Sequence, residues 1–348
     1  MAENSIRIGV VGAGANTRKL HIPGFQKIEG VEVVSVANRT RESSERTAAE
    51  FKIPQAFDAW HDLVASSDSN AIMIGTWPYL HGPVTLAALA AGKHVLTEAR
   101  MALNAVEARQ MLAASRGQPE LIAMVVPSPF TFAVDATIQD LISDGYLGDI
   151  LSIDLQGGAS GFLNSDAPLT WRQDADLSGD NILFMGIWYE ALMRWVGPAT
   201  RVMARAKVAA PLRRDEASGR LRAVRVPDHV EILADMACGA VARLQFSSIT
   251  GLAPSPGAWL YGSQGTLHYD HSAVKLYGGK RGESVLQEIA VKPEKRGGWR
   301  VEEEFIGAIR GSEPVRFTTF QDGVRYMDFS SGVTQSVLTG EAVSLPVS

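Results

Sequence analysis

The first third of the sequence alternates short apolar runs with helical patterns, and this alternation limits the choice of fold more than any other feature. Helical patterns at 42–52, 81–92 and 104–117 separate the apolar runs. This order is typical of βαβ units, whose parallel strands form a sheet that is buried on both faces. We therefore predict an N-terminal α/β domain of residues 1–126. Its expected strands are 6–14, 31–40, 71–78 and 93–100, and a last apolar run at 121–129 closes it.

After residue 126 the composition shifts toward glycine, aromatic residues and β-branched strand formers. Strand patterns follow one another with turns between them, which favours an α+β domain of residues 127–348 with a large open, mainly antiparallel sheet. The expected strands are 149–161, 200–210, 229–237, 240–249 and 257–270, and helices are expected near 133–145, 182–195, 300–310 and 321–339.

Composition limits the class of ligand and the cellular location that we expect. The chain has 348 residues, 46% of them hydrophobic, and a formal charge of −5 without a basic run or an acidic tail. It therefore favours a small-molecule substrate over nucleic acid or an anionic membrane. The single cysteine, Cys238, excludes an internal disulfide. The first residues lack a secretory signal, and no apolar run approaches the roughly 18 residues of a membrane span, so we expect a cytoplasmic protein.

A glycine pair follows the first expected strand and opens a helix. Gly12 and Gly14 permit a tight turn and a close backbone approach to a pyrophosphate at the helix N-terminus. The third glycine of the dinucleotide fingerprint is replaced by Thr17, which predicts looser packing between helix and strand. The residues expected to bind the cofactor here are Gly12, Gly14, Ala15, Asn16 and Thr17.

The end of the second strand indicates which nicotinamide cofactor fits. An NAD site usually has a carboxylate here to accept a hydrogen bond from the ribose 2′-hydroxyl. This chain has Asn38, Arg39 and Thr40 instead, which offer a cation and hydrogen-bond donors to a 2′-phosphate. We therefore expect NADP to be favoured over NAD, with NAD as the alternative cofactor. The alternative interpretation is a solvated turn.

Several segments in a fixed order resemble one known family, the Gfo/Idh/MocA oxidoreductases, which include glucose–fructose oxidoreductase and inositol 2-dehydrogenase. The similar segments are GVVGAG, GTWPYLHGPVTLAALAAGKHVLTEARMALN, LTWR, GDNILFMGIWYEAL, LYGSQGTL and GEAVSLP. The resemblance implies a Rossmann domain, a second domain with an open sheet, and a homodimer or homotetramer formed through that sheet. It also implies roles for further residues. Those expected at the cofactor are Thr76, Trp77, His81, Glu98, Trp171 and Arg172, and those expected at the substrate are Arg100, Ser128, Phe130, Phe184 and Trp188.

The chain differs from the family at the residues that usually transfer the proton. Relatives usually carry Glu-Lys-Pro, but here Ala99 and Arg100 follow Glu98. An aspartate and a histidine four residues apart in relatives correspond to Phe184 and Trp188. None of the replacing side chains is suited to proton transfer, because guanidinium stays charged and the others carry no titrating group. The remaining candidates are Arg100, Tyr189, Asp180 and His81, with Tyr79, Glu190 and a solvent molecule held by Glu98 as further alternatives.

Two functions remain open from the sequence. The first is an NAD(P)-dependent oxidoreductase that acts on a sugar, polyol, cyclic alcohol or related carbonyl compound with a non-standard proton donor. The alternative is a nucleotide-binding protein without net dehydrogenase activity, either a cofactor-bound lyase or hydrolase or a nucleotide-responsive binding protein. Phe184 and Trp188 are equally typical of core packing. No metal is expected, because no histidine and carboxylate grouping has zinc spacing. The Ala99–Arg100 peptide bond is expected to be trans, because a non-proline cis bond is costly.

Overall fold

The computed structural model describes residues 5–158 and 161–347, so the first four residues and the end of the expected strand 149–161 lie outside it. The chain forms two compact units. Unit 1 contains residues 1–127 and 300–324, and unit 2 contains residues 128–299 and 325–348.

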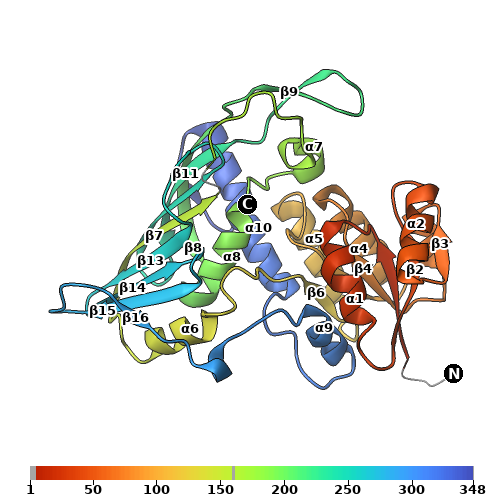
Figure 1. Cartoon of the computed structure of the whole chain (residues 1–348), viewed down its shortest axis with the longest axis horizontal. Coiled ribbons are helices and arrows are strands. Elements are labelled where there is room, and N and C mark those ends of the chain that lie inside the picture. The colour runs from red at the N-terminus through yellow and green to blue at the C-terminus, as the bar shows by residue number, and fades with distance from the viewer. Residues whose placement is uncertain (1–4, 159–160, 348) are drawn as a thin grey trace. The chain divides into compact units, whose positions relative to one another are not determined.

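Unit 1 contains a sheet of six parallel strands in the order β3-β2-β1-β4-β5-β6 (Figure 1). This is the doubly wound order in which ligands bind beyond the carboxyl ends of the strands. The predicted Rossmann architecture is therefore confirmed, although the sequence did not indicate the three-residue strand β3. The strands are β1 (Ile6–Val11), β2 (Val31–Ala37), β3 (Gln55–Phe57), β4 (Ala71–Ile74), β5 (His94–Thr97) and β6 (Ala123–Val125).

Residues 300–324 return to unit 1, whereas the sequence-based division assigned everything after residue 126 to the second domain. The reason is packing between α9 and α1. Phe305 and Phe25 meet edge to face with ring centroids 6.3 Å apart, and both side chains are fully buried. The helical segments of unit 1 are η1 (Thr17–His21), α1 (Ile22–Phe25), α2 (Arg41–Phe51), α3 (Trp60–Ala65), η2 (Pro78–Leu80), α4 (His81–Ala90), α5 (Ala105–Arg116) and α9 (Val301–Ile309).

Unit 2 contains a nine-stranded sheet in the order β16-β15-β14-β13-β7-β12-β11-β8-β17. Only the β7–β12 pair is parallel among the described strand pairs, so the prediction of a large, mainly antiparallel sheet is confirmed. The strands are β7 (Ile150–Gly158), β8 (Ala199–Lys207), β11 (His229–Met236), β12 (Val241–Ser247), β13 (Gly257–Gly262), β14 (Gly265–Asp270), β15 (Lys275–Lys280), β16 (Gln287–Ile289) and β17 (Val343–Ser344), and a separate hairpin pairs β9 (Leu212–Arg214) with β10 (Leu221–Ala223).

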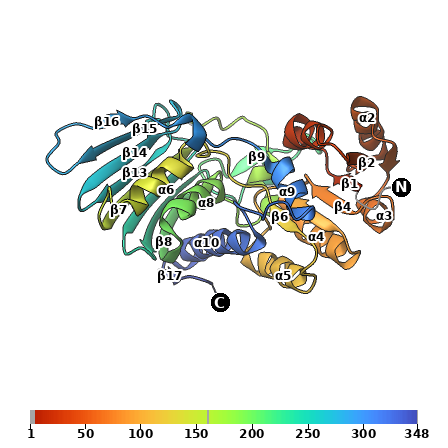
Figure 2. The ribbon, with the colours of Figure 1, turned by 90° about the horizontal axis from the view of Figure 1, so that it is seen from below.

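Three long helices of unit 2, α6 (Asp135–Ser143), α8 (Met185–Val196) and α10 (Phe320–Thr339), lie along one face of this sheet (Figure 2). The first turn of α10 belongs to unit 1 by its contacts. Tyr189 of α8 stacks on Phe329 of α10 with ring centroids 3.7 Å apart. The shorter segments of unit 2 are η3 (Trp171–Gln173), α7 (Ala175–Ser178) and η4 (Pro293–Lys295). Within residues 5–158 and 161–347, no helix combines the length and the apolar character needed to cross a membrane.

Candidate functional site

The turn after β1 brings the backbone close to the neighbouring strand end. Gly12 has a φ of 83°, and a Cβ atom there would lie 2.6 Å from Thr76 Cγ2 and 2.8 Å from Thr76 N. Only glycine fits both the conformation and the space. Gly14, Ala15 and Asn16, which follow, are exposed at the start of the helical segment. Their backbone N–H groups are therefore accessible to an anion such as a pyrophosphate.

Thr17 occupies the position of the third fingerprint glycine and is buried. The expected looser packing between helix and strand does not occur, because Gly75, which follows β4, leaves room for the Thr17 side chain. A Cβ atom on Gly75 would lie 2.0 Å from Thr17 Oγ1 and 2.3 Å from the carbonyl oxygen of Gly12. Close packing of helix and strand is thus kept by a glycine that follows β4, and the sequence-based expectation of looser packing was wrong.

Two of the three polar residues after β2 hold the local turn. Asn38 Oδ1 accepts a hydrogen bond from Ala13 N at 2.7 Å, and Asn38 Nδ2 donates to the carbonyl oxygen of Ser43 at 3.0 Å. Thr40 caps α2 by accepting a hydrogen bond from Ser43 N. Arg39 is exposed, and its guanidinium carbon lies 5.7 Å from the ring centroid of Trp77. Of these three residues, Arg39 is therefore the one whose polar group is exposed and not used in holding the turn.

His81 joins the turns that follow β4 and β5. Its Nδ1 lies 2.8 Å from the carbonyl oxygen of Arg100, and its Nε2 lies 3.0 Å from that of Thr76. Burial lowers the pKa of His81, so the ring is neutral and donates one hydrogen to one carbonyl. The geometry indicates a bracing role. The Ala99–Arg100 peptide bond is cis, so the expected trans form was wrong. The general preference of non-proline peptide bonds for the trans form therefore does not hold at this position.

Glu98 forms part of a charged cluster with His21 and Glu302. His21 is fully buried, and its Nε2 lies 3.1 Å from Glu98 Oε1 while its Nδ1 lies 2.5 Å from Glu302 Oε1. Burial alone would lower the pKa of His21, but the hydrogen bonds and charges of Glu302 and Glu98 outweigh it and raise the pKa to about 9. The imidazolium donates to a carboxylate at each side.

The same contacts hold Glu98 ionised. Burial by itself would raise the pKa of Glu98, yet its hydrogen bond and charge interaction with His21, together with a hydrogen bond from Asn16 Nδ2, lower it. The Glu98 side chain keeps 15% of its surface exposed, against 2% for Glu302. Sequence reasoning missed His21, because its main partner is 281 positions away and no local pattern links them.

The expected cofactor residues of unit 1 thus come together at the carboxyl ends of β1, β2, β4 and β5. Contacts between neighbouring turns connect them, from Ala13 with Asn38 to Asn16 with Glu98. The remaining expected cofactor residues, Trp171 and Arg172, belong to unit 2, where the guanidinium carbon of Arg172 lies 4.3 Å from the ring centroid of Trp171.

In unit 2, three of the expected substrate residues form one aromatic cluster. The ring centroid of Phe130 lies 6.1 Å from that of Phe184 and 5.2 Å from that of Trp188. Trp188 is buried, while Phe184 is 39% exposed. The two residues therefore differ. Trp188 packs in the core, whereas Phe184 lies at the surface. His271 completes the cluster, 5.0 Å from Phe130 and 5.1 Å from Trp188 between centroids.

Ser128, also expected at the substrate, is fixed by a buried ionic network. Its backbone N–H donates to Glu190, whose Oε1 lies 2.8 Å from Arg194 Nη1. Arg194 Nη2 lies 2.9 Å from Asp135 Oδ2 and donates to the carbonyl oxygen of Ser128. All of these side chains are buried or nearly so. The network positions the segment that leads to Phe130, and it assigns Glu190 to a structural contact.

Two candidate proton donors of unit 2 are engaged inside the fold. Tyr189 is fully buried, its hydroxyl oxygen accepts a hydrogen bond from Ala199 N at 2.7 Å, and burial raises its pKa. Asp180 Oδ2 accepts a hydrogen bond from Ser331 Oγ at 2.6 Å, and burial raises the pKa of Asp180. Neither residue belongs to the aromatic cluster.

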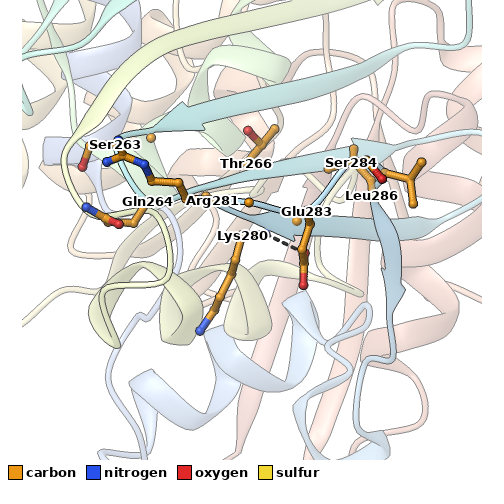
Figure 3. A pocket seen from close by; sticks show the side chains of 13 residues that line it. Ser263, Gln264, Thr266, Lys280, Arg281, Glu283, Ser284 and Leu286 are labelled. Atoms are coloured by element: carbon orange, nitrogen blue, oxygen red, sulfur yellow. Dashed lines mark hydrogen bonds between the residues drawn. The ribbon is translucent and has the colours of Figure 1, made fainter.

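An open hollow in unit 2 lies elsewhere, between the β13–β14 turn and the β15–β16 hairpin (Figure 3). There the backbone N–H of Lys280 donates to Glu283 Oε2 at 2.8 Å. Its lining contains none of the predicted site residues. Concavity alone therefore does not make it the site, because the converging polar groups lie at the turns described above.

The strand order and the glycine turn define unit 1 as a dinucleotide-binding Rossmann unit. Residues 6–125 match the family model of the oxidoreductase family with an NAD-binding Rossmann fold, and residues 136–268 match the GFO/IDH/MocA C-terminal domain. The chain belongs to this GFO/IDH/MocA oxidoreductase family, as its sequence motifs predicted.

Individual relatives show how far the similarity extends. Trans-1,2-dihydrobenzene-1,2-diol dehydrogenase from Mus musculus is 31% identical over 188 residues, 53% of this chain and 54% of that protein. Inositol 2-dehydrogenase from Serratia proteamaculans is 28% identical over 152 residues, 43% of this chain and 44% of that protein. The alignments thus span about half the length of these relatives. The structure of levoglucosan dehydrogenase in complex with NADH and L-sorbose has a TM-score of 0.85 at 20% identity, covers 98% of this chain and 99% of that chain, and shares the fold.

Proposed function

We propose that this protein is an oxidoreductase that prefers NADP and acts on a sugar, a polyol, a cyclic alcohol or diol, or a related carbonyl compound. The observation that carries the cofactor preference is Arg39, exposed after β2 with its guanidinium over Trp77. A 2′-phosphate would gain a charge-assisted contact from this guanidinium. The dinucleotide would lie on the turns of unit 1, and it would supply or accept the hydride.

Binding measurements test the cofactor preference. We expect the wild-type protein to bind NADPH more tightly than NADH, and Arg39→Ala to weaken NADPH about tenfold or more, as loss of one charged hydrogen bond predicts. NADH binding should change little. Arg41→Ala is the matched control, because Arg41 is also exposed but is paired with Glu45 and Asp58. Equal affinity of the wild-type protein for NADPH and NADH would refute the role of Arg39.

The substrate class is supported by the aromatic cluster and by the relatives. Partly exposed rings such as Phe184 stack well on the apolar face of a sugar or a cyclic diol. Arg100, Ser128, Phe130 and Trp188 are the other proposed substrate residues. Relatives named for a dihydrobenzenediol, inositol and levoglucosan all act on cyclic compounds with hydroxyl groups, by their names.

The proton route that we propose uses Glu98. His81 and Tyr189 are fully buried, and Asp180 Oδ2 is held by Ser331. Glu98 remains partly exposed and is held ionised beside protonated His21. An ionised carboxylate can hold a water molecule by accepting a hydrogen bond from it, and that water can exchange a proton with the substrate oxygen. The non-standard donor or acceptor would therefore be a solvent molecule at Glu98, in place of the missing lysine.

Absorbance at 340 nm tests the activity. We expect turnover with NADP or NADPH for at least one member of a panel of sugars, inositols, hydroxyacids and cyclic diols. If NADPH binds but no member of the panel is converted with either cofactor, the alternative of a nucleotide-binding protein without net dehydrogenase activity is favoured.

We also propose a homodimer or homotetramer formed through the open face of the nine-stranded sheet. Large apolar side chains are exposed on several of its strands, and Leu233 of β11 lies opposite Met203 of β8. An apolar face of this kind is typical of a protein interface. The other exposed apolar residues there are Leu151, Val241 and Tyr261. Leu233→Glu should give monomers in sedimentation experiments, and an unchanged mass of the assembly would contradict the proposal.

A further inference from the structure

His271 lies in the aromatic cluster with a fixed ring orientation. It follows β14, in which Leu267 and Tyr269 are buried while Thr266 and His268 are half-buried on the opposite face. Because side chains alternate along a strand, His271 continues the series of Leu267 and Tyr269, on the face that carries the helices. Its ring is half-buried between Phe130 and Trp188.

The hydrogen bonds around His271 determine which nitrogen carries the hydrogen. Its Nδ1 lies 3.1 Å from the carbonyl oxygen of Phe130, which can only accept. The same oxygen accepts a hydrogen bond from the Tyr269 hydroxyl at 2.7 Å, whereas that hydroxyl lies 3.3 Å from His271 Nδ1. The shorter contacts place the hydrogen on Nδ1. In the neutral ring Nε2 is then a lone-pair acceptor, and no described residue bonds to it.

The charge state of the ring agrees with this assignment. Burial lowers the pKa of His271, and the hydrogen bond to the carbonyl oxygen of Phe130 and the charge of Asp270 only partly oppose this effect. The Asp270 carboxylate is itself engaged with Ser255 Oγ and with the backbone N–H of Ser272. Tyr269 remains protonated, because burial raises its pKa to about 12. The ring is therefore neutral near pH 7.

We propose that His271, Phe130 and Phe184 form a subsite for a ring compound with a hydroxyl group, in which His271 Nε2 accepts a hydrogen bond from that hydroxyl. Phe184 offers an exposed ring for stacking, and the imidazole offers an acceptor beside it. The subsite deepens the proposed function, since it identifies the group that selects hydroxyl-bearing rings, and it rests on that function for its link to a reaction.

Nitrogen-15 resonances of the seven histidines provide a test that does not depend on turnover. The probes are myo-inositol and trans-cyclohexane-1,2-diol, added to the full chain without nucleotide, and His271→Gln assigns the resonance. We expect the free protein to show the Nδ1–H form of His271 and each bound probe to shift its Nε2 resonance. His268→Gln is the matched control, because His268 also lies among aromatic rings with a lowered pKa but on the opposite face of the sheet.

Calorimetry gives the second readout. The variant His271→Phe keeps a ring but has no acceptor, so loss of one net hydrogen bond predicts roughly five- to tenfold weaker probe binding, with no change in His268→Phe. The proposal is overturned if neither probe binds, if a probe binds without moving the His271 resonance, or if both variants bind like the wild type. A shift of His271 without any turnover would leave the subsite standing and the oxidoreductase assignment refuted. Turnover with an unchanged KM in His271→Phe would refute the subsite and leave the oxidoreductase assignment standing.

Discussion

His21 should carry a proton far above the usual range of histidine, and this proton should stabilise the fold. The His21 pKa is raised from 6.5 to about 9, because Glu302 and Glu98 both accept hydrogen bonds from the buried ring. A difference of about 2.5 pKa units corresponds to about 3 kcal/mol of unfolding free energy. Since the folded-state pKa is the higher one, this stabilisation is fully present below about pH 6.5. It is lost as the pH rises through about 9.

The variant His21→Gln removes the titration and keeps a hydrogen-bonding side chain. We expect the difference in unfolding free energy between wild type and variant, measured in urea, to shrink by about 3 kcal/mol from about pH 6 to about pH 10. His94→Gln is the control. Burial lowers the pKa of His94, so its contribution changes only at lower pH and the difference should stay flat from about pH 7 to about pH 10.

A direct titration shows whether His21 carries this proton. Nitrogen-15 resonances of His21 should report a doubly protonated ring up to about pH 9. A His21 midpoint at or below 6.5, or a free-energy difference that does not vary with pH, would show that the two carboxylates do not hold an imidazolium. The charge assigned to Glu98 would then also have to be revised.

Three further outcomes are expected. Gly75→Ala should destabilise the protein by about 1–3 kcal/mol in urea unfolding, because its Cβ atom would meet Thr17 and the carbonyl oxygen of Gly12; removal of the threonine hydroxyl should not rescue it. Arg194→Met should cost about 3–5 kcal/mol, because it leaves buried carboxylates without a counter-charge; a loss below about 1 kcal/mol would contradict the network. Ala99→Lys should increase the rate of NADPH oxidation or NADP reduction at 340 nm if the family's usual proton geometry persists, and an unchanged rate would indicate a different proton route.

Part of the cofactor site was predictable because it depends on local geometry. Gly12 and Gly14 follow the first strand, and Asn38 and Arg39 follow the second, so parallel pairing alone brings them to one edge of the sheet. The family segments added Thr76, Trp77 and Glu98 at the ends of the next strands. Only the fold showed that Asn38 and Thr40 are used by the turn, which leaves Arg39 as the exposed cation.

The chemistry of the site depends on contacts between distant residues. The sequence showed that Ala99, Phe184 and Trp188 cannot move a proton. It could not show that Tyr189 is sealed in the core or that Phe184 is exposed while Trp188 is buried, because burial depends on what packs on each helix face.

The sequence by itself determined the two kinds of architecture, the nucleotide-binding turn and the family, because these follow from periodicity, glycine positions and local motifs. The tertiary structure decided which residues form ion pairs, hydrogen bonds or ring contacts with one another. Glu302 reaches His21 across 281 positions, and His271 reaches Phe130 across 141. Such pairs form only when packing brings separate segments together, and no local propensity encodes them.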